Sequence, residues 1–320
     1  MMMKTEEVLA KFLTLPNAVR IGEGDKSFVY VPATKEKSVL LVAHADTVWN
    51  QGNADLKIVI NDNTLESAQK GVGIGADDRA GICMLWKLRN TGHALLIPNM
   101  EERGCIGARF LMESEEWRKR INQHLFAIEL DRMNSSDLAF YDIATDAFKD
   151  FCERKFPEYK RTRGSFTDIT VLCDDQFHKE DTLCGVNVSV GYYGQHGEGE
   201  RLVLPEWQRS LTYCYKLLTS EEELPRFAHK YVQYTTTSYY GGSGYTSGRS
   251  ASYDIDYDYR GYNVSPKYQS KMTSQHVGAT SSDLADSILV CPNEKCDAMF
   301  DETEYRQANN ACPYCKESFE

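Results

Sequence analysis

Short apolar, β-branched runs alternate with stretches of helical spacing over residues 26–220. The apolar runs predict strands at 27–31, 38–45, 56–60, 94–99, 125–130, 138–141 and 186–191. Helical spacing predicts helices at 78–89, 106–113, 146–154, 168–173 and 205–219. In the last of these, Trp207, Leu211, Tyr215 and Leu218 recur every three or four residues, so one face is expected to pack on a sheet. This alternation is typical of an α/β sheet covered by helices.

The pattern ends abruptly after residue 223. Residues 231–285 hold ten tyrosines among Ser, Thr and Gly, with few Leu, Ile or Val. Such a segment buries too little aliphatic surface to offset its ordering entropy, so we predict a largely disordered linker at 224–287. A tyrosine platform for stacking nucleic-acid bases is the alternative, but basic and acidic residues balance within the segment. The predicted domains are therefore 1–223, the linker, and 288–320.

Composition narrows the function classes. Hydrophobic residues make up 42% and charged residues 26%, as in an ordinary globular protein, and the net charge of -11 disfavours nucleic-acid binding. No apolar run approaches the roughly 18 residues that span a bilayer, and no signal-peptide pattern opens the chain, so we expect a cytoplasmic protein without a membrane partner. Reduced, buried thiols are the interpretation of six scattered cysteines: Cys83, Cys105, Cys152, Cys173, Cys184 and Cys214.

Two polar clusters stand at the boundaries of predicted elements. His44 and Asp46 follow an apolar strand, and alternation along a strand puts both on one side. The carboxylate can then reach one ring nitrogen while the other binds a metal; a buried core histidine is the alternative. Asp77 and Asp78 follow a glycine-rich turn at the predicted start of a helix. They could support a metal bridge or merely cap the helix.

Three more clusters follow in order along the chain. Glu101 and Glu102 come directly after an apolar strand, and such a pair can divide its roles between binding a metal and taking a proton from water. Asp131 closes the next apolar strand, with Glu129 two residues earlier on the same face, and His196 lies in a polar loop. Ligand-binding groups of α/β sheets gather at strand ends, so the five clusters together predict a metal site.

The series HAD, GIGADDRAGI, EERGCIGA, ELD and GQHGEGE resembles the co-catalytic zinc exopeptidase superfamily, which includes peptidase T, bacterial leucyl aminopeptidase and zinc carboxypeptidase and aminoacylase relatives. The similarity covers roughly residues 20–220, and GADDRAG with EERG is its most diagnostic part. The resemblance implies a mixed central sheet flanked by helices. It also implies an amide hydrolase with two metal ions and a cis peptide bond between Asp77 and Asp78.

The resemblance also implies a role for each site residue. One metal ion would be held by His44, Asp77 and Asp131. The other would be held by Asp77, Glu102 and His196. Asp46 would orient His44, and Glu101 would be the general base and acid. Two dications about 3.5 to 4 Å apart can share a hydroxide and polarise an amide carbonyl, and nitrogen and carboxylate ligands suit zinc, so we expect two Zn²⁺.

The inserted lid domain of peptidase T and the carboxypeptidase-like members is expected to be absent. Only 64 residues lie between Asp131 and His196, and the elements predicted there account for much of them. The architecture therefore resembles the lidless aminopeptidases. Glu129 competes with Asp131 for its ligand position, and Asp168 is interpreted as a helix cap near the site.

The tail carries a separate signal. Cys291 and Cys296 form one pair, and Cys312 and Cys315 form another after fifteen residues. Four thiolates at this spacing suit a tetrahedral structural zinc, so 288–320 is predicted to be a zinc ribbon with one Zn²⁺. CPYC also resembles a glutaredoxin motif, but no βαβ pattern follows it. The loop between the pairs is acidic, which favours a protein partner.

The sequence therefore predicts a dinuclear zinc-dependent amide hydrolase, an aminopeptidase-like exopeptidase with a peptide or small amide substrate. A deacylase of small N-acyl metabolites using the same metals is the first alternative. The second alternative is a catalytically silent adaptor protein. The complete set of a free base and five ligands argues against silence.

Overall fold

The computed structural model describes residues 3–49, 56–174, 181–229, 289–291, 293, 296, 299–300 and 302–318. The predicted linker lies outside the described residues from position 230 onward. Its first part, 224–229, is described and includes a short strand paired with the folded region. No helix of the described part has the length and apolar character needed to cross a membrane.

An eight-stranded mixed sheet is the core of the structure, in the order β1-β2-β6-β3-β7-β11-β8-β9. The strands are β1 (Val19–Glu23), β2 (Lys26–Val31), β3 (Leu40–Val42), β6 (Ala94–Pro98), β7 (Ala127–Arg132), β8 (Asp137–Ala139), β9 (Lys160–Thr162) and β11 (Gly185–Ser189). The four central strands β6, β3, β7 and β11 run parallel, while β2 and β8 join them antiparallel. The mixed α/β sheet expected from the sequence is confirmed.

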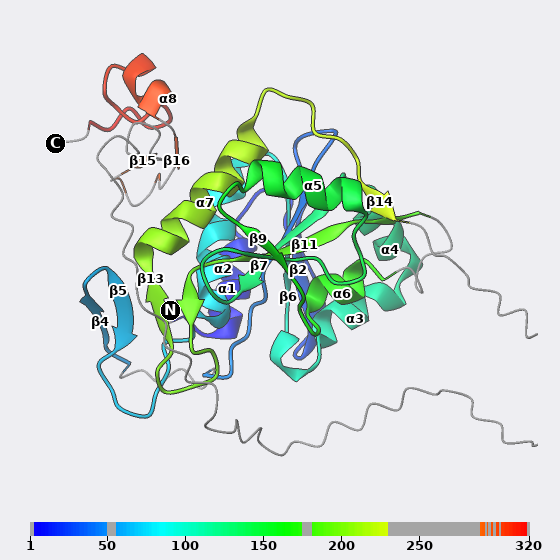
Figure 1. The fold of residues 1–320 in the computed structure, drawn as a ribbon, viewed down its shortest axis with the longest axis horizontal. Helices are drawn as coiled ribbons and strands as arrows, with labels where there is room; N and C mark the ends of the chain where they lie inside the picture. Colours follow the sequence, from blue (N-terminus) through cyan, green and yellow to red (C-terminus); the bar gives the residue numbers. More distant parts are fainter. Residues whose placement is uncertain are drawn as a thin grey trace, which may run out of the picture. The chain divides into compact units, whose positions relative to one another are not determined.

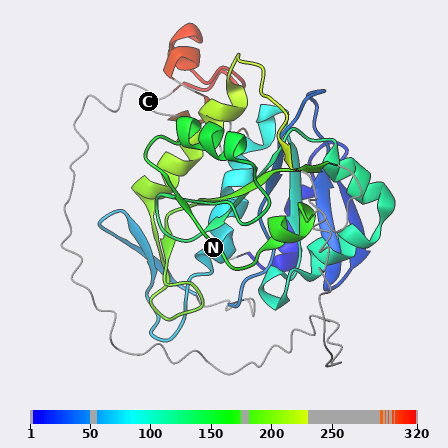
Figure 2. The same ribbon diagram turned by 45° about the vertical axis from the view of Figure 1, so that its right-hand side comes forward.

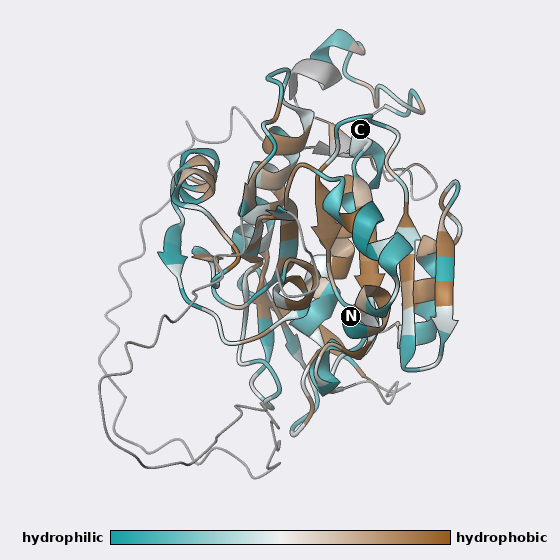
Figure 3. Ribbon diagram, turned by 90° about the vertical axis from the view of Figure 1, so that its right-hand side faces the viewer, coloured by the Kyte–Doolittle hydropathy of each residue, from teal (hydrophilic) through white to brown (hydrophobic). Residues whose placement is uncertain are grey.

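Helices cover both faces of this sheet (Figures 1 and 2). They are α1 (Thr5–Phe12), α2 (Ala76–Leu88), α3 (Ile106–Glu113), α4 (Glu115–Asn122), α5 (Asp146–Lys155), α6 (Asp168–Leu172) and α7 (Leu204–Thr219). The strands are largely apolar (Figure 3). Alternate side chains of β3 belong to opposite cores. Leu41 belongs to the core that contains side chains of α1, α2, α5 and α7, whereas Leu40 and Val42 belong to the core that contains side chains of α3, α4 and α6.

Smaller sheets extend this core. A four-stranded antiparallel sheet has the order β12-β13-β5-β4, and a two-stranded one pairs β10 with β14. Their strands are β4 (Ile58–Asn61), β5 (Thr64–Ser67), β10 (Thr182–Leu183), β12 (Tyr192–Tyr193), β13 (Arg201–Val203) and β14 (Ala228–His229). Between Asp131 and His196 the chain contributes β8, β9 and β11 to the main sheet, so these strands belong to the core domain rather than to a separate lid.

Candidate metal centre

The parallel strands β3, β6 and β7 end at the same edge of the main sheet, and the expected site residues gather there. His44 and Asp46 follow β3, and Asp131 is the next-to-last residue of β7. Glu101 and Glu102 open a short 3-10 helix, η2 (Glu101–Arg103), directly after β6. The carboxyl ends of neighbouring parallel strands thus bring together groups that lie far apart in the sequence.

Asp77 lies between the two histidines. One carboxylate oxygen, Oδ1, is 3.1 Å from His44 Nε2, and the other, Oδ2, is 3.2 Å from His196 Nε2. Asp77 stands at the start of α2, where its peptide bond to Asp78 is cis, as the resemblance implied. Each oxygen of this one carboxylate therefore faces a different imidazole, which is the arrangement that a bridging ligand requires.

The first group of donors forms around His44 Nε2. Asp131 Oδ1 lies 3.4 Å from this nitrogen, close to Asp77 Oδ1. Asp78 is also near enough to share a metal with His44 and Asp131. Its two oxygens, however, accept backbone hydrogen bonds from His44 N at 3.1 Å and Gly81 N at 2.9 Å. Asp78 therefore fastens α2 to the end of β3, and Asp77 is the better third donor.

The second group forms around Asp77 Oδ2. Glu102 Oε2 lies 2.7 Å from His196 Nε2, and His44, Asp77 and Glu102 also have donor atoms within 4.8 Å of one another. The other oxygen of Glu102 is buried without a hydrogen-bond partner among the described residues. An orphaned carboxylate oxygen beside converging nitrogen and oxygen donors fits a bound cation.

Asp46 links His44 to the glutamate pair through hydrogen bonds. Its Oδ1 accepts from His44 Nδ1 at 3.2 Å and from Glu101 N at 3.0 Å, while its Oδ2 accepts from Glu102 N at 3.2 Å. The side chain is almost wholly buried. Because Nδ1 is committed to Asp46, the Nε2 atom of His44 is directed at Asp77 and Asp131.

The surrounding carboxylates favour the positively charged form of both histidines. Burial alone would lower the pKa of His44, but Asp131, Asp46 and Asp77 raise it well above its usual value. Hydrogen bonds to Asp77 and Glu102 raise the pKa of His196 to about 10. Without a cation, the imidazoles thus retain protons at neutral pH. A metal ion would displace those protons and supply the same positive charge.

Glu101 differs from its neighbour because the structure records no ion pair for it among the described residues. Burial raises the pKa of its carboxyl well above the usual range, and the nearby acids Asp131, Asp168 and Asp77 add to the shift. The side chain lines a cavity of about 210 Å³. The same cavity is lined by the metal-facing residues Asp77, Glu102, Asp131 and His196.

The choice between Asp131 and Glu129 favours Asp131. Asp131 Oδ1 faces His44, and Oδ2 accepts a hydrogen bond from Thr167 Oγ1 at 3.2 Å. Tyr192 fixes its backbone by donating to the Asp131 carbonyl at 2.7 Å. Glu129 lies two residues earlier on β7 and is buried. Its Oε2 has no hydrogen-bond partner among the described residues.

The interpretation of Asp168 as a helix cap is wrong. Thr167 is the N-cap residue of α6, and Asp168 is the first residue inside the helix. Both of its carboxylate oxygens are buried without a hydrogen-bond partner among the described residues. Burial raises the pKa of Asp168 to about 7. Asp168 is also one of the nearby acids that raise the pKa of Glu101.

Glu200 is the last residue of the GQHGEGE motif, but the sequence did not predict a role for it in the site. It is buried, and its carboxylate accepts from Gly75 N at 2.7 Å and Asp77 N at 3.0 Å. Gly75 has a positive φ of 66°, which glycine adopts readily. Glu200 therefore fastens the turn that presents Asp77.

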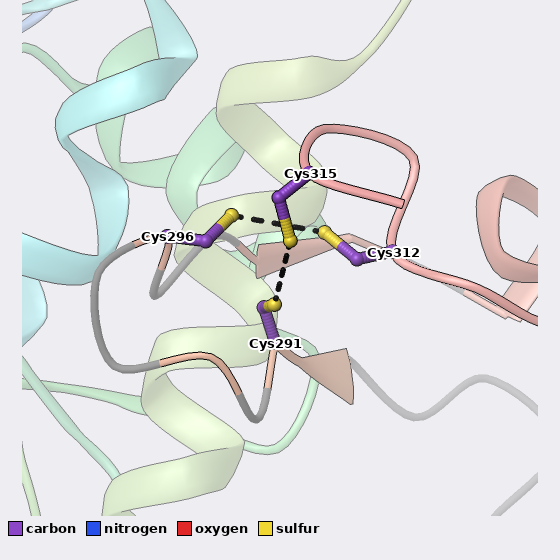
Figure 4. A group of neighbouring side chains, drawn as sticks. All are labelled: Cys291, Cys296, Cys312 and Cys315. Carbon is purple, nitrogen blue, oxygen red and sulfur yellow. Dashed lines mark hydrogen bonds between the residues drawn. The ribbon is translucent and has the colours of Figure 1, made fainter. Parts of the chain in front are cut away.

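The four C-terminal cysteines converge in a separate cluster (Figure 4). Cys291 Sγ lies 3.4 Å from Cys315 Sγ, and Cys296 Sγ lies 3.8 Å from Cys312 Sγ. Disulfide bonds are much shorter, about 2.05 Å. Tetrahedral ligands about 2.3 Å from a zinc ion would be separated by about 3.8 Å. Cys291 and Cys296 lie in sequence between the paired strands β15 (Leu289–Val290) and β16 (Met299–Phe300), whereas Cys312 and Cys315 follow α8 (Glu302–Gln307).

Comparison of the sequence with family models and with curated proteins returns no match. Solved structures do match. The aminopeptidase PepT from Bacillus cereus is 14% identical over 66% of this chain and 91% of that one, with a TM-score of 0.51. A tripeptidase from Staphylococcus aureus is 12% identical over 68% and 93% (TM-score 0.48). The TET1 peptidase of Pyrococcus horikoshii is 13% identical over 68% and 100% (TM-score 0.42).

The likeness to PepT shows that the main domain has the fold of that aminopeptidase. The fold implied by the motif series is thereby confirmed. The likeness at 14% identity establishes the fold, and the chemistry rests on the residues that this chain places at the sheet edge.

Proposed function

We propose that this protein is a dinuclear zinc-dependent exopeptidase. The observation that carries the proposal is the position of Asp77, whose two carboxylate oxygens face one histidine each. Around it, His44 and Asp131 supply one set of donors, and Glu102 and His196 supply the other. The peptidase names of the structural neighbours, PepT among them, agree with this chemistry.

The donor set fits two metal ions. Imidazole nitrogen and carboxylate oxygen are ligands that zinc binds well, with manganese or cobalt as possible substitutes. The buried, unpartnered Oε1 of Glu102 and the raised pKa of His196 both indicate a place for a cation. When bound, the two ions would supply an activated water and polarise the scissile carbonyl.

Glu101 is the proposed general base and acid. It lies next to a proposed ligand, lines the same cavity, and has no recorded ion pair among the described residues. In the proposed reaction its carboxylate takes a proton from the attacking water and then delivers it to the leaving amine nitrogen. Asp46 supports this role because it accepts the Glu101 backbone N–H and so fixes where the side chain starts.

The cavity favours a small substrate group. Its volume of about 210 Å³ is below that of ordinary drug-sized pockets, about 300 Å³ or more. A terminal residue of a peptide fits such a space, which favours an exopeptidase over an enzyme that cuts within a chain. A deacylase of small N-acyl metabolites remains the second candidate because its substrates have the same size and the same scissile bond.

The C-terminal cysteines form a proposed structural zinc ribbon. Their sulfur separations of 3.4 and 3.8 Å suit tetrahedral thiolate ligands better than disulfides. A small module of this kind offers a surface for a protein partner.

A metal count combined with a substrate panel tests the proposal. We expect three zinc ions per chain. The His44→Ala and His196→Ala variants should lose the two ions at the sheet edge more readily than the ion held by the four cysteines. Chelation should abolish hydrolysis and added zinc should restore it. Dipeptides and aminoacyl anilides should be cleaved faster than N-acyl amino acids; the reverse order would favour the deacylase. Full activity in a metal-free preparation would refute the proposal.

A further inference from the structure

Tyr141 has an unusual backbone conformation beside the candidate site. Its φ is 52°, in the left-handed region that bulky residues rarely adopt. It follows β8, and its ring lies against Gly164. A Cβ at position 164 would lie 2.2 Å from Tyr141 Cε1 and 2.6 Å from its hydroxyl oxygen. The fold therefore holds this ring in a cradle that only glycine leaves open.

A buried amide ties the Tyr141 hydroxyl to Asp131, the proposed ligand. Asn187 Nδ2 donates to the phenolic oxygen at 3.5 Å, and Asn187 Oδ1 accepts from Asp131 N at 3.1 Å. Asn187 lies on β11, the strand between β7 and β8, and is 2% exposed. One side chain thus sets the position of the hydroxyl relative to the site.

The phenolic proton is available for donation. In the hydrogen bond from Asn187, the Tyr141 oxygen is the acceptor. Burial raises the pKa of Tyr141 well above its usual value, with Glu129 adding to the shift, so the group stays protonated at neutral pH. By contrast, the hydroxyls of Tyr192 and Thr167 in the same cavity already donate to Asp131. Tyr141 also lines this cavity, together with Glu101.

From this geometry, we propose that the Tyr141 hydroxyl donates a hydrogen bond to the substrate carbonyl oxygen as negative charge develops on it. The inference rests on the proposed hydrolysis. The attacking water oxygen forms a bond to the carbonyl carbon, the carbonyl π pair moves onto oxygen, and the water proton passes to Glu101. When the C–N bond breaks, that proton goes to the amine. Tyr141 keeps its own proton throughout and stabilises the oxyanion.

The main test is Tyr141→Phe in the full chain. Loss of one oxyanion donor should lower kcat by about 10²–10³, while KM changes less than about threefold and zinc content is unchanged. Binding of a phosphinic pseudopeptide, which mimics the tetrahedral state, should weaken more than binding of a non-cleavable substrate analogue. The matched control is Tyr193→Phe. That hydroxyl donates to Glu206 at 2.6 Å and should leave all these values unchanged.

A second variant covers the case in which Tyr141→Phe does not fold. Replacing Tyr141 by 4-fluorophenylalanine puts a fluorine in the place of the hydroxyl, which keeps the ring against Gly164 but cannot donate a hydrogen bond, so kcat should again fall by about 10²–10³. Wild-type protein without hydrolytic activity would refute the proposed function. If the wild-type protein is active and either Tyr141→Phe or the 4-fluorophenylalanine protein has a kcat within threefold of it, the role of Tyr141 is overturned.

Discussion

The two candidate metal regions are built in opposite ways. The ligands at the sheet edge extend from His44 to His196, and each comes from a different segment of a large core. The four cysteines lie within residues 291–315 and, among the described residues, are backed by a core of Cys291, Phe300 and Cys312, with Cys296 and Tyr305 packed against it. The packed core of the main domain positions the first set of ligands. In the second region, metal binding must itself help to stabilise the folded segment.

Hydrogen bonds show the same difference. At the sheet edge, Asp46, Glu200 and Thr167 hold ligands or their backbones in place without any metal. In the cysteine cluster, the sulfur atoms contact one another, and the backbone hydrogen bonds to them come from the same short segments: from Asn293 to Cys291, and from Tyr314 and Cys315 to Cys312. Metal removal should therefore empty the first region and unfold the second.

The largest effect is expected in the cysteine cluster. Replacing both Cys312 and Cys315 by Ser should remove one zinc per chain, since structural zinc in such small modules contributes about 10 kcal/mol or more to folding. Amide exchange should show loss of protection in 289–318 alone, while activity on small substrates persists. If small-substrate activity disappears although the main domain stays folded, the two regions are not independent.

At the sheet edge, Glu101→Gln should lower kcat by about 10²–10⁴ because the proton acceptor is lost, with both zinc ions retained. The matched variant Glu102→Gln should instead lose zinc, since Glu102 faces His196 directly. Metal analysis beside steady-state kinetics separates the two. Zinc loss from Glu101→Gln would mean that the roles of base and ligand are exchanged.

Asp46→Asn should have a smaller effect, on affinity rather than on chemistry. Asp46 orients His44 without lying among the proposed ligands, so we expect zinc affinity to fall by about 10–100-fold. Zinc-buffer titration gives this value directly. In the cysteine cluster, the four residues close enough to share an ion are all proposed ligands. We therefore expect no variant there that weakens zinc binding only by altering the orientation of a ligand. An unchanged affinity would show that His44 is positioned by the core alone.

Sequence reasoning succeeded where the signal is local. Parallel strands end at one edge, so an acid or histidine just after an apolar run is already placed near the site, and the motif series marks those positions. The strand predicted at 38–45 has regular strand structure only at Leu40–Val42, although Ala43 and Ala45 still donate backbone hydrogen bonds to Leu96 and Pro98 of β6. Helices α3 and α7 begin and end close to their predicted positions.

The rest depends on contacts that no local pattern encodes. Glu200 reaches Gly75 and Asp77, more than 120 residues earlier, and looks like any acid in a glycine-rich loop. Tyr141 acquires its role only through Gly164 and Asn187. Helix α4 was not predicted because Trp117 and Ile121 are its only buried residues, spaced one turn apart among charges.

The last and most specific effect concerns Asp168, a buried acid that has no counterpart among the described residues of the cysteine cluster. Its folded-state pKa of about 7 exceeds the value of about 3.9 expected for an unfolded chain. Between these values the folded state holds a proton that the unfolded state has released. This group therefore lowers the free energy of unfolding as pH rises from about 4 to 7, by up to about 1.4 kcal/mol per pH unit.

Asp168→Asn removes this titration. In chelated protein, the difference in unfolding free energy between wild type and variant should shift in favour of the variant as pH rises from 5 to 7.5. The buried amide also lacks partners, but that penalty does not depend on pH, so the slope rather than the absolute stability carries the test. Urea unfolding at several pH values, followed by the far-ultraviolet circular dichroism of the main domain, measures it. Parallel curves for the two proteins would mean that Asp168 is ionised in the folded state, and that its charge must be balanced by a proton held elsewhere in the cluster.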